Sequence, residues 1–478
     1  MDQLKSFHIL TVGNVPQLVR DLWNRIAERG GYWISHIAHP SYDDRSWPAT
    51  LRTHEVYFFR DDIRTPIPPA DREFLASLEQ DDVPTIHNMI MSDRVVSKLP
   101  YDEALGYADL LAKRLFVLYE AIKPTVVIGS FDALHGSMAL AVARRVGIPW
   151  YAPHFTALPS GQAALASNLT PASPVLFDPH REEELRADAD RLLSAFENRR
   201  IAAAAYIPPS LFSVSFIFGQ IPAQLAAFFR VLRRRRLKRF LKYTDYRNSY
   251  LVTGLVGEAL RLRKNLWFLN RRQLLRQPPQ QRFAFFGLHM QPESSIDVFA
   301  HFFSNQERVI ELIARSLPPT HSLLIKLHKS DTPNYSTALL ARYSRFPGVQ
   351  LVSAHADTFA FIKQADLVFS IQGTIGLEAA LLGKPVIIFG DSPTKLFPSV
   401  STIGKTIDLP ALVRQKLAEP PPSRSAIVSA FAAYLAPFYP AAHNDWTIKP
   451  TDAQIQDFVK LFELLRIRDA AVASDAGT

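Results

Sequence analysis

The chain has 478 residues, of which 47% are hydrophobic and 21% are charged, a composition typical of a globular protein rather than a disordered one. This length exceeds what one hydrophobic core usually holds, so we expect two domains and linking material. The absence of cysteine excludes a disulfide framework, cysteine–zinc sites and a cysteine nucleophile, and it is compatible with a reducing, cytoplasmic setting.

The net charge of +9 is concentrated in one segment. Residues 230–276 contain fifteen Lys or Arg against two acids, Asp245 and Glu258, so the rest of the chain is slightly acidic. We therefore expect no general nucleic-acid-binding surface. Three interpretations of the arginines at 233–236 stay open: contact with an anionic membrane surface, binding of an anionic acceptor or nucleotide, and a solvated helix face.

One long uncharged stretch, residues 211–229, precedes this basic segment. Gly219 and Pro222 interrupt it, which favours an interfacial or protein-buried helix over a membrane-spanning one. The first residues lack the apolar core of a signal peptide, so we expect no secretory signal there.

The N-terminal half alternates strand and helix patterns. Apolar runs predict strands at residues 7–12, 55–60 and 126–129, and helical spacing predicts helices at residues 15–29, 102–122 and 136–146. Residues 130–135 are predicted to form the loop after the third strand, and ligand-contacting side chains collect in such loops. Asp132 and His135 are therefore candidates, with a helix-capping aspartate and a solvated histidine as the alternatives.

A second alternating region follows Pro278 and Pro279. Strands are predicted at residues 281–286, 321–327, 349–352, 367–371 and 386–389, with helices at residues 296–316, 358–363 and 375–382. This order implies a parallel sheet that holds its ligand at the carboxyl ends of the strands. Further helices are expected near residues 409–417, 425–435 and 452–465.

The loop after the strand at 367–371 has the chemistry of a phosphate site. Gly373 permits close approach to the backbone, Thr374 offers a hydroxyl, and the following helix presents unpaired N–H groups to an anion. Glu378 is predicted in the first turn, where it could accept hydrogen bonds from ribose hydroxyls. The alternative is that Glu378 only complements the helix dipole.

Three pieces of this region occur in a recognisable order: FGLHMQPESSI at 286–296, IKLHKS at 325–330 and SIQGTIGLEAALLGKPVIIFG at 370–390. Together they resemble the C-terminal domain of the bacterial capsule polysaccharide biosynthesis family, whose members include Kdo transferases. The sequence departs from the family pattern at Met290, where an aromatic residue is usual, and at Lys329, where a proline is usual. The nucleotide base therefore stays open.

The resemblance implies an α/β fold of the GT-B type, with two Rossmann-like domains facing across a cleft and a helical basic insertion between them. We place an acceptor-side domain at 1–165, a helical and basic segment at 166–280, a nucleotide-sugar-binding domain at 281–410, and helices that pack back across the domains at 411–478.

The same resemblance, combined with the positions of the polar residues, gives the candidate site. Glu293 is the first choice for the group that takes the acceptor's proton or stabilises a cationic sugar centre, and His289, Asp132 and His135 are further catalytic candidates. The donor-binding candidates are Gln291, Ser294, Lys326, His328, Gln372, Gly373, Thr374 and Glu378. The alternatives are a helix-capping role for Glu293 and a structural role for His328.

We expect no cofactor and no metal ion, because no acidic pair of the DxD type lies in a suitable loop and Asp61 with Asp62 reads as a solvated turn. The expected function is that of a cytoplasmic glycosyltransferase, peripheral at the inner membrane, that transfers a sugar from a nucleotide-sugar donor to a glycan or glycolipid acceptor. Two other functions stay open: transfer of a polyol phosphate from a nucleotide carrier, and a catalytically inactive scaffold of a polysaccharide assembly complex.

Overall fold

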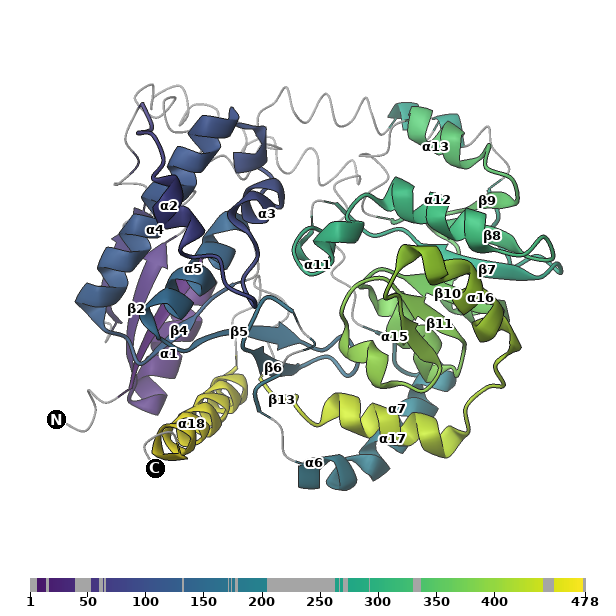
Figure 1. The fold of residues 1–478 in the computed structure, drawn as a ribbon. Coiled ribbons are helices and arrows are strands. Elements are labelled where there is room, and N and C mark those ends of the chain that lie inside the picture. The colour runs from purple at the N-terminus through teal and green to yellow at the C-terminus, as the bar shows by residue number, and fades with distance from the viewer. Residues whose placement is uncertain are drawn as a thin grey trace. The chain divides into compact units, whose positions relative to one another are not determined.

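The computed structural model describes residues 7–13, 17–38, 53–59, 63, 66–130, 133–170, 172, 174–176, 179–203, 263–265, 267–269, 274–291, 293–329, 337–441 and 451–475 (Figure 1). These residues form two compact units. The first comprises those within Met1–Pro179 and Ala436–Thr478, and the second those within His180–Leu237 and Arg247–Leu435. The chain therefore returns to the first unit at its C-terminal end.

The first unit contains a sheet in the order β13-β6-β5-β4-β1-β2-β3. The five strands from β5 to β3 are parallel, and β6 and β13 add an antiparallel edge. The strands are β1 (His8–Gly13), β2 (Trp33–Ala38), β3 (Thr53–Phe58), β4 (Val126–Ile128), β5 (Trp150–Phe155), β6 (Gln162–Ala166) and β13 (Tyr439–Pro440).

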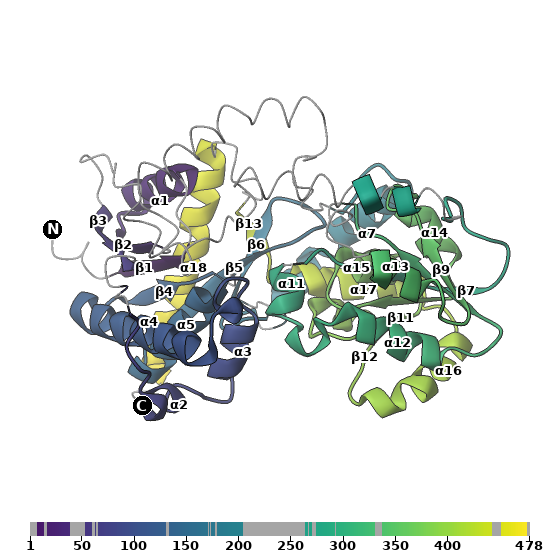
Figure 2. The ribbon, with the colours of Figure 1, turned by 90° about the horizontal axis from the view of Figure 1, so that it is seen from above.

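Helices join and cover these strands. They are α1 (Gln17–Gly30), α2 (Arg72–Ala76), α3 (Ile86–Met91), α4 (Tyr101–Ile122), α5 (Ala133–Val146) and α18 (Asp452–Asp475), with a short 3-10 turn, η3 (Val96–Lys98). Figure 2 shows α18, in yellow, alongside α1. Trp23 of α1 packs on Phe462 of α18, and the Tyr32 hydroxyl donates to Glu463 Oε1 at 2.6 Å. These contacts fasten the C-terminal helix to the first unit.

The second unit contains a sheet of parallel strands in the order β12-β11-β10-β7-β8-β9. The strands are β7 (Phe283–Gly287), β8 (Ser322–Lys326), β9 (Val349–Val352), β10 (Leu367–Ser370), β11 (Val386–Ile388) and β12 (Val400–Thr402). The helices are α6 (Pro179–Glu184), α7 (Arg186–Glu197), α11 (Ser294–Asp297), α12 (Gln306–Ser316), α13 (Thr337–Tyr343), α14 (Thr358–Gln364), α15 (Thr374–Leu381), α16 (Leu409–Ala418) and α17 (Arg424–Leu435), with 3-10 turns η6 (His301–Phe303), η7 (Pro393–Leu396) and η8 (Thr406–Asp408).

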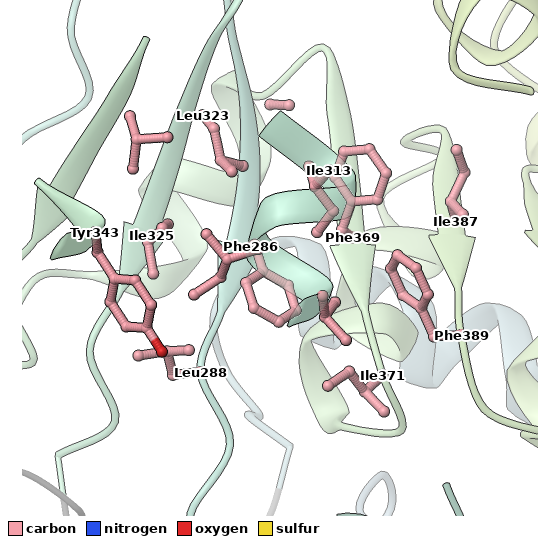
Figure 3. Packing of buried hydrophobic residues seen from close by; sticks show 14 of the residues in the cluster. Phe286, Leu288, Ile313, Leu323, Ile325, Tyr343, Phe369, Ile371, Ile387 and Phe389 are labelled. Carbon is pink, nitrogen blue, oxygen red and sulfur yellow. The ribbon is translucent and has the colours of Figure 1, made fainter. Parts of the chain in front are cut away.

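Alternate residues of β7 are buried on opposite faces of this sheet. Phe286 packs in a cluster with Ile313 of α12 and Phe369 of β10 on one face (Figure 3). Phe285 stacks on Phe361 of α14 on the other face, with ring centroids 5.7 Å apart. Burial of β7 on both faces is what a parallel sheet between two helical layers requires. This sheet fixes the strand ends on which the candidate site is built.

The fold class predicted from the sequence, two Rossmann-like α/β domains, is confirmed by the two sheets. Two local predictions are wrong. The helix predicted at 296–316 is broken into α11, η6 and α12, because Asn305 begins a new helix by accepting the N–H of Arg308. The helix predicted from 136 already begins at Ala133, so His135 is helical and does not lie in a loop.

Several predicted features lie outside the described residues. They include the uncharged stretch at 211–229, the arginines at 233–236, Asp132, and the pair Asp61 and Asp62. Within the described ranges, no helix combines the length and the apolar character that a membrane crossing needs.

Candidate active site

The site is built at the carboxyl edge of the second unit's sheet. Strands β10, β7 and β8 are neighbours and run parallel, so the loops that follow them emerge at the same edge. The loop after β7 carries His289, Gln291 and Glu293, the segment after β8 carries His328, and the loop after β10 carries Gln372 and Gly373. Sheet order alone therefore gathers the three sequence motifs.

His289 connects the first and third motifs. Its ring is buried, and its Nε2 accepts the backbone N–H of Ile371 at 3.4 Å. Burial, assisted by nearby His328, lowers the pKa of His289 to about 3, so the ring is neutral near pH 7. With Nε2 accepting, the neutral ring carries its hydrogen on Nδ1. This chemistry suits a hydrogen-bond donor better than a general base.

The third motif meets the first through two glycines. A methyl group at Gly373 would lie 2.5 Å from Cε1 of His289, and one at Gly287 would lie 2.1 Å from Cδ1 of Ile375. A methyl group at Gly373 would force the buried His289 ring or the loop to move, so glycine permits the close approach of α15 to the loop after β7. Gly373 is the N-cap of α15 and makes no side-chain hydrogen bond to the first turn, in which the N–H of Gly376 donates to the carbonyl of Gly373 at 3.2 Å. The N-terminus of α15 is therefore the place at this edge where backbone N–H groups can meet an anion.

Glu378 lies one turn inside α15, as its fifth residue, and not in the first turn as predicted. Its carboxyl group is hydrogen-bonded to the Thr374 side chain four residues earlier. Burial raises the pKa of Glu378 to about 7, although the Thr374 hydrogen bond and the charge of Lys326 oppose the shift. A buried carboxyl group with a pKa raised to near neutrality, close to a helix N-terminus, is typical of a functional site.

Lys326, the last residue of β8, interacts electrostatically with both Glu378 and His328. Burial lowers the pKa of Lys326, while the charge of Glu378 opposes this shift. Burial also lowers the pKa of His328, and the Lys326 charge lowers it further. The Nζ of Lys326 donates to the carbonyl of Ala354 at 3.0 Å, which anchors the ammonium group at this edge. The site therefore holds one partly buried positive charge among neutral histidines.

The loop after β7 is held by a chain of amide and carboxylate groups. Gln306 of α12 accepts the N–H of His289 at 2.8 Å and donates to the carbonyl of His289 at 3.0 Å. Glu293 occupies the N-cap position of α11, but its side chain makes no capping hydrogen bond, so the capping alternative is wrong. Instead, the backbone N–H of Glu293 donates to Asp297 Oδ2 at 3.0 Å.

Sequence reasoning missed Gln306 and Asp297. In the sequence, Gln306 is an ordinary polar residue at the start of a helix. Only its burial in the structure shows that it holds the loop after β7.

The remaining predicted donor-binding residues also lie at this edge. Ser294 is the first residue of α11. The Nε2 of Gln372 donates to the backbone carbonyl of Asp391, beyond β11, at 2.7 Å, which joins the loops after β10 and β11. The second unit thus brings together Glu293, His289, Lys326, His328, Gln372, Gly373, Thr374 and Glu378.

His135, the candidate of the first unit, is buried rather than solvated. Its Nε2 is hydrogen-bonded to the Tyr107 hydroxyl at 3.0 Å, and its ring packs edge-on against Phe59. Burial lowers the pKa of His135 to about 4, although nearby Asp93 opposes the shift. A catalytic role for His135 stays a prediction, as does that of Asp132.

Across the parts of the chain that are described, no cluster of three or more His, Asp or Glu side chains is arranged to hold a metal ion. The charge that the site offers to an anion comes from Lys326 and from the first turn of α15.

A parallel sheet covered by helices on both faces defines the doubly wound α/β class, in which ligands bind at the carboxyl ends of the strands. Residues 221–431 match the family model described as "Capsule polysaccharide biosynthesis protein". The match confirms the resemblance drawn from the three motifs, all of which lie inside it: this part of the chain is related to capsule polysaccharide biosynthesis proteins. No curated protein matches the sequence.

The fold is similar to several solved structures. A β-Kdo 2,4 transferase, KpsC of Thermosulfurimonas dismutans, is 12% identical over 64% of this chain and 79% of its own, with a TM-score of 0.34. The UDP-GlcNAc 2-epimerase of Methanocaldococcus jannaschii is 13% identical over 87% and 94%, with a TM-score of 0.26. MnaA of S. aureus, solved with UDP, is 11% identical over 90% and 92%, with a TM-score of 0.28. All three TM-scores lie below 0.5, so these structures carry no argument about function. Any proposal for the function of this chain rests on its own residues and on the family match.

Proposed function

We propose that the chain is a glycosyltransferase of bacterial surface polysaccharide biosynthesis. It transfers a sugar, with Kdo among the candidates, from a nucleotide-sugar donor to a lipid-linked or growing glycan acceptor. The observation that carries the proposal is the convergence of a ligand-accessible helix N-terminus at Gly373, buried Glu378 and partly buried Lys326 at one sheet edge, within the segment that matches the family.

In this proposal, the donor's phosphate lies on the first turn of α15. The N–H groups there and the ammonium group of Lys326 stabilise the charge that develops as the nucleoside phosphate leaves, so no metal ion is required. Glu378 accepts hydrogen bonds from the ribose, and His328 and Gln372 complete the donor site. His289 donates a hydrogen bond from Nδ1, in keeping with its neutral ring.

Glu293 is the proposed catalytic carboxylate. It lies at the N-terminal end of α11, in the same loop as His289, and its extended backbone (φ −152°, ψ 141°) precedes the helix. The first unit supplies the acceptor-binding residues in this proposal, with Asp132 and His135 as the candidates.

Turnover of a nucleotide sugar tests the assignment. We expect Glu293→Ala and His328→Ala to abolish or greatly reduce nucleotide release, by at least about 100-fold for Glu293, while circular dichroism shows folded protein. Glu311→Gln, which removes a partly exposed carboxylate paired with Arg308 and Arg315 on α12, serves as the control and should keep full activity. If both site variants remain fully active, the site assignment is wrong, and if the wild type releases no nucleotide from any donor, the function is wrong.

We further propose that the basic segment at 230–276 holds the enzyme at the anionic inner face of the membrane, where a lipid-linked acceptor is found. The fifteen basic residues provide the attraction, at about 1 kcal/mol for each one near the surface. Replacing the four arginines at 233–236 with glutamine should move the protein from anionic vesicles to the soluble fraction in a sedimentation assay. Unchanged partitioning would refute the membrane role.

A further inference from the structure

The side chain of Gln291 is engaged by its own loop. Its Nε2 donates to Asp297 Oδ1 at 2.9 Å and to the carbonyl of Ser304 at 2.9 Å, and its Oε1 accepts from Gln306 Nε2 at 2.9 Å. A primary amide has two N–H donors, so both are already used inside the protein. This arrangement leaves Gln291 no hydrogen to offer to a phosphate or a ribose oxygen.

The hydrogen-bond partners of Gln291 are themselves bonded to His289 and Glu293, the two residues proposed to act on the donor. Gln306, a buried residue, brackets His289 by bonding to both its N–H and its carbonyl group. Asp297 uses its other oxygen, Oδ2, to accept the N–H of Glu293 at 3.0 Å. One continuous set of hydrogen bonds therefore runs from His289 through Gln306, Gln291 and Asp297 to the backbone of Glu293.

Asp297 fixes the backbone of Glu293 from both sides: its own N–H donates to the carbonyl of Glu293 at 2.9 Å, and its Oδ2 accepts the N–H of Glu293 at 3.0 Å. Glu293 has extended dihedral angles ahead of α11, a helix of only four residues, and its side chain does not cap that helix. A carboxylate that acts on a sugar centre must be held within a fraction of an ångström, and misplacement by about 1 Å can cost a factor of about 100 in rate.

We propose that Gln291, Asp297 and Gln306 form a positioning network for Glu293 and His289, and that Gln291 acts through this network and does not bind the donor. The role of Glu293 rests on the proposed glycosyltransferase function. The network itself does not, since it is defined by hydrogen bonds within the protein.

Binding and turnover separate the two roles of Gln291. In Gln291→Ala, we expect the turnover of the donor sugar to fall by about 100-fold, while the Kd for the nucleoside diphosphate or monophosphate of that donor changes by less than about threefold. Asp297→Asn should behave in the same way. Each oxygen of Asp297 accepts an N–H, from Gln291 or from Glu293, and the NH₂ group of asparagine would replace one of these acceptors with a second donor. A tenfold weaker Kd in Gln291→Ala alone would overturn the proposal and show that Gln291 contacts the donor.

A double-mutant cycle tests whether the two residues act as one unit. Gln291→Ala combined with Asp297→Asn should be no slower than the slower single variant, whereas independent roles would multiply the two losses. Glu311→Gln is the matched control on α12, because it removes a partly exposed carboxylate that pairs with Arg308 and Arg315 and takes no part in the network.

Hydrogen exchange tests the network without any ligand. The peptide that contains the N–H of Glu293 should exchange at least about tenfold faster in Gln291→Ala, Asp297→Asn and Gln306→Ala than in the wild type, with no change in Glu311→Gln. Unchanged exchange in the three network variants would overturn the positioning role. Faster exchange in a protein that turns over no nucleotide sugar would keep the network and refute the glycosyltransferase assignment.

Discussion

Gly373→Ala should abolish nucleotide binding and destabilise the second unit. The added methyl group would lie 2.5 Å from Cε1 and 3.1 Å from Nδ1 of His289, a ring that is buried and bonded to the backbone of Ile371. Either the ring or the loop must move, at a cost of about 1–3 kcal/mol, and the first turn of α15 moves with it. Thermal unfolding with and without a saturating nucleotide should show a lower Tm and loss of the ligand-induced rise.

Two variants sharpen this experiment. Gly404→Ala is the matched control, because a methyl group there would meet no atom within 4 Å, and it should unfold and bind like the wild type. Gly373→Ala combined with His289→Ala removes the ring that the methyl group would strike, so part of the lost stability should return. If Gly373→Ala binds nucleotides with unchanged affinity, the phosphate site is not at α15.

Glu378→Gln should stabilise the protein at alkaline pH and leave it unchanged in acid. The folded protein holds the Glu378 proton up to about pH 7, whereas an unfolded chain releases it near pH 4.5. The stabilisation by this proton is complete below the unfolded pKa and is lost as the pH rises through the folded pKa. The interval corresponds to about 3 kcal/mol, and glutamine avoids the loss because it cannot ionise.

Thermal unfolding measured between pH 4.5 and pH 8.5 tests the direction of this pH dependence. The difference in Tm between Glu378→Gln and the wild type should be near zero at pH 4.5 and should grow to several degrees above pH 7. Glu73→Gln, at an exposed position of α2, should follow the wild type across the range. An advantage for Glu378→Gln that is largest at low pH would contradict the buried, protonated carboxyl group.

Most of the second unit could be predicted from sequence because its strands are apolar runs of the kind that a doubly covered parallel sheet demands. The strands of the first unit were harder to predict from the sequence. Strand β6 has the sequence QAALA, which lacks β-branched and aromatic residues, and its pairing with β5 rather than its composition makes it a strand. Strand β13 has two residues and pairs with β6 across most of the chain length. Such long-range pairing leaves no local pattern.

The candidate site shows the same division. The three motifs indicated its loops, because polar and glycine residues follow buried strands at Leu288, Leu327 and Ile371. The pattern could not show that Glu378 lies in the second turn of α15 with a raised pKa, since burial decides that value. It could not reveal Gln306 either, because a glutamine at the start of a helix is usually solvated, and only the loop that folds over this one gives it partners.

The central claim is that the second unit binds an activated sugar through the first turn of α15 and Glu378. Titration of the wild-type protein with UDP-, GDP-, CMP- and CDP-sugars, followed by thermal shift, tests it most directly. We predict that one nucleotide class raises the Tm in proportion to its occupancy, and that Gly373→Ala removes this rise while Gly404→Ala keeps it. No rise with any nucleotide sugar, or an equal rise in Gly373→Ala, would contradict the claim.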